Sequence, residues 1–114
     1  VDLHYKLSQG KEALGQLNEL LALYKQRGEN QRAISVLSEL VELRQQEVEL
    51  HRLLADAYQS AGRLPEAIQE WDLASRILWN AGESEEARRV VRYLMVLDPE
   101  GADSYRARLR QMGG

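Results

Sequence analysis

The chain repeats itself at a spacing of 34 residues, and this periodicity limits the fold more than any other feature of the sequence. Segment 17–37 aligns with segment 51–71 without a gap. Matched positions carry the same residue in Leu20 and Leu54, Tyr24 and Tyr58, Gly28 and Gly62, Ala33 and Ala67, and Ile34 and Ile68. A repeat of this length is one supersecondary unit, which buries its apolar face by stacking on the next unit.

The spacing within the unit predicts two antiparallel helices joined by a tight turn. Leu54 and Tyr58 are four residues apart, so they lie on one helix face. Gly62 follows four residues later and can adopt the left-handed conformation that ends a helix. Ala67 then allows the returning helix to approach closely, and the large side chain of Trp71 fills the space beneath it. Each unit is therefore predicted to be a helical hairpin.

Composition also favours an all-α fold. Ala, Glu, Lys, Leu and Arg make up just over half of the chain, whereas Thr and Phe are absent. Strands would require more β-branched and aromatic side chains than the chain contains. We expect helices at about 1–9, 12–27, 31–45, 48–61, 65–81, 84–97 and 102–112.

The second unit resembles a tetratricopeptide repeat. Its segment LLADAYQSAGRLPEAIQEWDLA carries the signature residues Leu54, Ala55, Tyr58, Gly62, Ala67, Trp71 and Ala74. The first unit is a weaker copy, because Leu21 and Leu40 replace small residues and no proline closes the unit. The resemblance implies a right-handed superhelix of stacked hairpins (an α-solenoid) with about six or seven helices. It also implies that the first helix of each hairpin lines a concave groove for an extended peptide or a partner helix.

The repeats divide a single domain over 1–114 into five parts. These are 1–13 as the end of a preceding unit of a longer protein, 14–47 as repeat 1, 48–81 as repeat 2, 82–100 as a partial repeat 3, and 101–112 as a capping helix. The third unit breaks the period, because Gly82 follows Gly62 by only 20 residues. Either the helix near 65–81 serves both the second and the third unit, or an extended second helix is followed by an extra one.

The resemblance also assigns groove-facing residues to this sequence. They are Asn18, Ala22 and Lys25 on the first helix of repeat 1, Arg52, Asp56 and Gln59 on that of repeat 2, and Asp72, Arg76 and Trp79 if helix 65–81 also acts as a first helix. The members of each triplet are four and three residues apart, so they share one helical stripe. Trp79 can line the groove or pack beneath the following helix, and we expect the second arrangement. Asp56 would repel a carboxylate, which disfavours binding of a C-terminal carboxylate.

No set of residues indicates catalysis, a metal or a cofactor. His4 and His51 are the only histidines, and their spacing does not form a zinc motif, so His51 is expected to be packed or half exposed in its repeat slot. Cysteine is absent, which excludes disulfides and thiolate sites but says little about the cellular compartment. No apolar run reaches the roughly 20 residues that span a bilayer, so we expect no membrane insertion.

Three functions from different classes remain open. The leading hypothesis is a non-catalytic module that binds a protein or peptide partner. The second is a structural segment that self-associates, because the exposed end of a helical array can stack on its twin. The third is a nucleic-acid-binding helical array like the related pentatricopeptide repeats. A net charge of −3 with acidic and basic residues interleaved speaks against it, because phosphate binding requires a basic face.

Overall fold

The structure is a computed structural model that describes residues 10–113. Over this range six α-helices and one 3-10 turn follow one another, and no strand occurs between them. They are α2 (Gly10–Gln26), α3 (Asn30–Leu43), α4 (Val48–Ser60), α5 (Leu64–Asn80), α6 (Ser84–Leu97), η1 (Pro99–Gly101) and α7 (Ala102–Gln111). The all-α class is confirmed, and each of these α-helices matches a predicted one to within two residues at both ends. The helix predicted at 1–9 lies outside the described residues.

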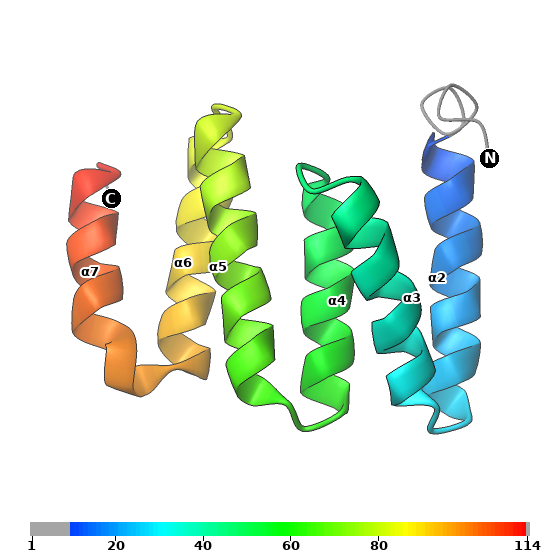
Figure 1. Cartoon of the computed structure of the whole chain (residues 1–114). Helices are drawn as coiled ribbons and strands as arrows, with labels where there is room; N and C mark the ends of the chain where they lie inside the picture. The colour runs from blue at the N-terminus through cyan, green and yellow to red at the C-terminus, as the bar shows by residue number, and fades with distance from the viewer. Residues whose placement is uncertain (1–9, 114) are drawn as a thin grey trace.

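The helices stand side by side in chain order, and successive helices run in opposite directions (Figure 1). Each one packs against the next along the chain. Side chains also connect helices that are two apart in sequence, so α4 reaches α6 and α5 reaches α7. Helix α5 packs on both α4 and α6. Because a shared helix and an extended helix would both make these contacts, the assignment of α5 to one repeat or two stays a prediction.

Three of the connections between helices are built in the same way. A glycine with positive φ follows the helix: +71° at Gly28, +74° at Gly62 and +84° at Gly82. After Gly62 the amide of Arg63 reaches back and donates to the carbonyl oxygen of Tyr58 at 2.8 Å, which satisfies an end carbonyl of α4. The expectation that these glycines end their helices is confirmed.

Small residues at the repeat positions bring the helices close together. Ala67 of α5 and Ala87 of α6 are fully buried, and the matched Ala33 of α3 is 6 % exposed. The large apolar side chains beneath them, Leu37 and Val91, are fully buried as well. The alanine and the large residue four positions later therefore pack as the hairpin pattern predicts.

The buried side chains form two clusters. One lies among α3 and α4 with part of α2, and it contains Ala33, Ile34, Leu37, Leu50, Leu54 and Ala57. The other joins α5, α6 and α7, and it contains Leu78, Ala87, Val90, Val91, Leu94, Tyr105, Leu109 and Met112. Tyr105, Leu109 and Met112, at the end of the chain that was predicted to form a capping helix, thus face the core.

Helix α2 is less buried than the repeat predicts. Leu20 matches Leu54 in the repeat, yet Leu20 is 38 % exposed whereas Leu54 is 3 % exposed. Leu23 is also exposed. The difference arises because α3 is the main neighbour of α2, whereas α4 lies between α3 and α5. None of the helices described between residues 10 and 113 is long and apolar enough to cross a membrane.

Candidate partner-binding site

A cavity of about 160 Å³ opens between α2, α3 and α4. Its apolar lining consists of Leu21, Ala22, Ala33, Leu37, Leu53 and Ala57. Its polar lining consists of Asn18, Lys25, Asn30, Asp56 and Ser60. An apolar hollow with a few polar groups around it is the usual form of a binding site in proteins.

The repeat explains why α2 and α4 both contribute to this cavity. Because α3 returns between them, α2 and α4 run in the same direction (Figure 1). The 34-residue repeat gives these two helices matched residue positions. The complete first triplet, Asn18, Ala22 and Lys25, lines the cavity, and Asp56 joins it from α4. Four of the residues assigned to a groove by resemblance are therefore brought together.

The charged groups of this cavity have no partner within the described part of the chain. Lys25 and Asp56 are both exposed, and neither takes part in any of the ion pairs that join residues of 10–113. One end of the cavity is closed by a hydrogen bond in which Asn30 Nδ2 donates to the carbonyl oxygen of Ser60 at 3.2 Å. The cavity thus combines an apolar interior with one cation and one anion that form no ion pair with another residue of 10–113.

Arg52 and Gln59 share a stripe with Asp56, but they do not line this cavity, because they bind α6. Arg52 Nη2 donates to Glu86 Oε2 at 2.7 Å. This hydrogen bond, more than the charge of Arg52 itself, lowers the pKa of the Glu86 carboxyl below its ordinary value. Gln59 Nε2 donates to the Tyr93 hydroxyl at 3.1 Å.

Gln59 also accepts a hydrogen bond from Trp71, which completes a small aromatic cluster. Trp71 Nε1 donates to Gln59 Oε1 at 2.9 Å. The Trp71 and Tyr93 rings meet edge to face with centroids 5.2 Å apart. Gln59 therefore ties α4 to α5 and α6.

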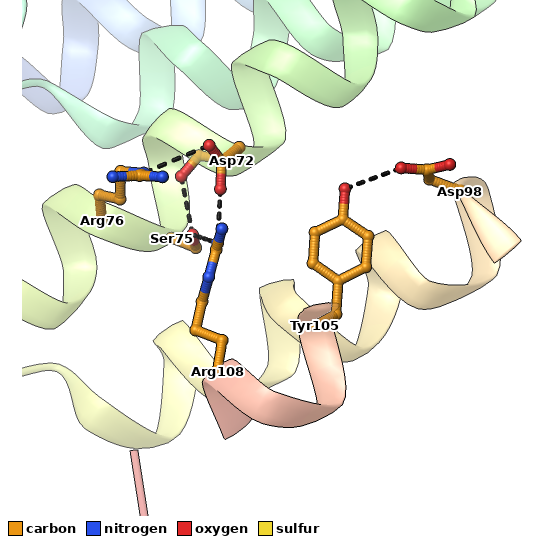
Figure 2. A network of polar contacts seen from close by, with 6 residues as sticks. All are labelled: Asp72, Ser75, Arg76, Asp98, Tyr105 and Arg108. Carbon is orange, nitrogen blue, oxygen red and sulfur yellow. Dashed lines mark hydrogen bonds and ion pairs between the residues drawn. The ribbon is translucent and has the colours of Figure 1, made fainter. Parts of the chain in front are cut away.

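Asp72 belongs to a network that attaches α7 to α5 (Figure 2). The Asp72 carboxylate accepts hydrogen bonds from Arg76 of its own helix and from Arg108 of α7. Arg108 also lies over the Tyr105 ring, with its guanidinium carbon 5.6 Å from the centroid. The Arg108 side chain thus points toward α5 and not away from the core.

Arg76 and Trp79, the other two residues of the third triplet, lie apart from the residues of the first and second triplets that line the cavity. Arg76 lines a different hollow, between α3 and α5, which also contains His51. Trp79 does not line the α2–α4 cavity. Trp79, which was expected to pack beneath the following helix, is 40 % exposed and is not part of the buried cluster of α5, α6 and α7. It lies one residue before the end of α5, so its exposure depends on the side chains that surround this end of the helix.

Tyr105 and Asp98 form the second contact of the cap (Figure 2). The Tyr105 hydroxyl donates to Asp98 Oδ2 at 3.0 Å. Burial, with the Asp98 carboxylate as the next cause, raises the pKa of Tyr105 to about 12. Gly101 lies against this pair: a Cβ atom at Gly101 would be 2.7 Å from Asp98 Oδ2.

Seven of the eleven lining residues were not assigned to the groove by sequence reasoning: Leu21, Asn30, Ala33, Leu37, Leu53, Ala57 and Ser60. Asn30 begins α3, and Leu53 and Ser60 occur on α4 outside the predicted triplet. The signal for Leu53 and Ser60 was available, because they lie three residues before and four residues after Asp56 and so share its side of the helix. Asn30 had no such signal, since its role depends on how the turn at Gly28 places the start of α3.

Between residues 10 and 113, no group of three His, Asp or Glu side chains could hold a metal ion. Comparison with known proteins adds no relative: no family model matches the chain, and no curated protein matches it.

Proposed function

We propose that this chain is a protein-interaction module of the tetratricopeptide kind, which binds a segment of another protein between α2 and α4. In this proposal the chain binds its partner without catalysing a reaction. The helical hairpins stack as a right-handed superhelix, and the matched first helices provide the binding face.

The observation that supports the proposal is the convergence of Asn18, Ala22, Lys25 and Asp56 on one cavity. Their positions were assigned from the resemblance to the tetratricopeptide repeat, and they come from two helices, α2 and α4, that have α3 between them in the chain. The lining has apolar side chains in the interior and, at exposed positions, two charges that form no ion pair with another described residue. This combination suits contact with another protein.

The direct test is selection of peptides from a randomised peptide library displayed on phage, with the full chain as the target. Peptides that bind the native chain should lose affinity for a Lys25→Ala/Asp56→Ala variant. The matched control is Glu85→Ala/Arg92→Ala, which removes one exposed acid and one exposed base from α6, outside the cavity. Circular dichroism and the urea midpoint confirm that both variants are folded. Failure to select any peptide, or equal binding to both variants, contradicts the proposal.

Arg52 is left unchanged in this test because its substitution would break the contact with Glu86. A loss of binding would then have two explanations, whereas Lys25 and Asp56 make no such contact within the described chain.

Self-association is a second candidate function, and the exposed Leu20 and Leu23 of α2 favour it. They are three residues apart and lie on neighbouring positions of one helix face. Sedimentation equilibrium distinguishes the two functions. A mass that rises with concentration, and that returns to the monomer mass in Leu20→Gln/Leu23→Gln, would support self-association.

A further inference from the structure

The size of the α2–α4 cavity suits a single side chain. Drug-sized ligands occupy pockets of roughly 300–1,000 Å³, which is larger than this cavity of about 160 Å³. An apolar protein cavity of about 150 Å³ holds one benzene-sized group. The interior therefore has room for one side chain of leucine size.

The composition of the lining selects an apolar side chain. The deepest lining residues are Leu37, Ala33 and Ala57, which are 0 %, 6 % and 8 % exposed. They carry no side-chain hydrogen-bonding group, so a polar side chain inserted here would lose its bonds to water without replacement. Asn30, the polar residue at one end, already donates to Ser60.

The charged residues that line the cavity favour particular residues on either side of the inserted side chain in the partner segment. Lys25 of α2 and Asp56 of α4 line the cavity from different helices, and no ion pair joins them to each other or to another described residue. Elsewhere on the matched stripes the charges are already paired, as Arg52 is with Glu86 and Asp72 with Arg108. On the matched stripes, the charges without an ion-pair partner among the described residues are therefore the two that line the cavity.

We propose that this cavity is an anchor pocket for one leucine-sized aliphatic side chain of a partner segment. An acidic residue on one side of the anchor pairs with Lys25, and a basic residue on its other side pairs with Asp56. The anchor is internal to the segment, since a terminal carboxylate would meet the Asp56 carboxylate. This inference rests on the proposed function and specifies the chemistry of the partner.

The probe is a phage-displayed library of random dodecapeptides, selected on the full chain. The expected outcome is enrichment of Leu, Ile or Met with an acidic and a basic residue on opposite sides of it. Titration calorimetry of one selected peptide should show binding about 10- to 100-fold weaker when its anchor is replaced by Ala.

Two chain variants test the pocket and the charges separately. Ala22→Leu places a side chain in the cavity from an exposed position on α2, and it should reduce binding of the selected peptide at least about tenfold. Gln16→Leu is the matched control, because it adds the same side chain to an exposed position of α2 outside the cavity lining. When the selection is repeated on the Lys25→Glu variant, the selected peptides should carry Lys or Arg in place of the enriched acidic residue.

The outcomes separate this inference from the proposed function. Peptides that depend on Lys25 and Asp56 but contain no aliphatic anchor, or that bind Ala22→Leu normally, would overturn the anchor pocket and leave the interaction module intact. Selected peptides whose flanking charges do not change with Lys25→Glu would overturn the charge assignment. Selection of no binding peptide would overturn both proposals.

Discussion

His51 of α4 and Glu70 of α5 are in contact, with 2.8 Å between Nδ1 of the imidazole and Oε1 of the carboxylate. The second ring nitrogen, Nε2, lies 2.8 Å from the carbonyl oxygen of Gln45 in the loop before α4. His51 is 3 % exposed and belongs to the small set of buried polar residues. One side chain thus joins the α3–α4 connection to α5. Of the two arrangements that the sequence left open for His51, packed or half exposed, the structure has the packed one.

Replacing His51 by Leu should destabilise the chain by about 2–3 kcal/mol, because the Gln45 carbonyl and the Glu70 carboxylate lose a buried partner. Glu70→Gln keeps an oxygen acceptor near Nδ1 and should cost about 1 kcal/mol. Urea unfolding followed by circular dichroism measures both changes. An unchanged unfolding free energy in His51→Leu would show that these contacts are not needed for stability.

Leu54 and Leu20 occupy the same repeat position, yet their replacement by Ala should have unequal effects. Leu54→Ala should cost about 2–5 kcal/mol, because it leaves a cavity among α3 and α4. Leu20→Ala should cost about 1 kcal/mol or less, because the side chain is already 38 % exposed. Thermal and urea unfolding of the two variants measure the difference. Equal losses would mean that α2 is buried as the repeat alone suggests.

Gly62 and Gly15 should respond oppositely to substitution by Ala. Gly62 has φ of +74°, which L-residues adopt at a cost of roughly 1–2 kcal/mol, so Gly62→Ala should destabilise the chain by about 1 kcal/mol. Gly15 lies within α2 and no atom comes within 4 Å of a Cβ built there. Gly15→Ala should therefore stabilise the chain by roughly 0.5–1 kcal/mol. If both substitutions changed the free energy of unfolding in the same direction, the result would contradict the turn geometry.

Tyr105 should make stability depend on alkaline pH. Its pKa is raised from 10.0 to about 12 in the folded chain, so the neutral phenol is favoured by folding. The stability that it contributes is complete below pH 10.0 and is lost as the pH rises through about 12. Ultraviolet absorption of the phenolate and urea unfolding at several alkaline pH values measure the effect.

Tyr105→Phe is the control for this pH dependence. It removes the hydrogen bond to Asp98, so it should cost about 1 kcal/mol at neutral pH and reduce the loss of stability above pH 10.0. A loss of the same size above pH 10.0 in this variant would assign the effect to other groups.

The elements that the sequence predicted well are those fixed by local physics. Gly62 ends α4 because its conformation is permitted to glycine, and Ala67 is buried because any larger side chain would separate two helices. These requirements act within a few residues, so the repeat shows them directly. They account for the agreement of the helix boundaries and of the buried positions in α3, α5 and α6.

The candidate site was predictable only where the repeat is regular. Asn18, Ala22, Lys25 and Asp56 gather because α2 and α4 are matched first helices. Arg52 and Gln59 have the same helical phase as Asp56, but α6 supplies partners for them that a pattern within one helix cannot show. The 40 % exposure of Trp79 also depends on where the neighbouring helices lie, which a pattern within one helix does not show.

The position of the cavity links binding to the order of α2. A ligand between α2 and α4 contacts a helix that otherwise depends mainly on α3, so its binding free energy adds to the free energy that holds α2 in place. Amide hydrogen exchange in α2 should therefore slow when the cavity is filled, while exchange in α6 and α7 changes little. Binding of a partner would then make the first described helix more ordered. A neighbouring segment of a larger assembly could respond to this change in order.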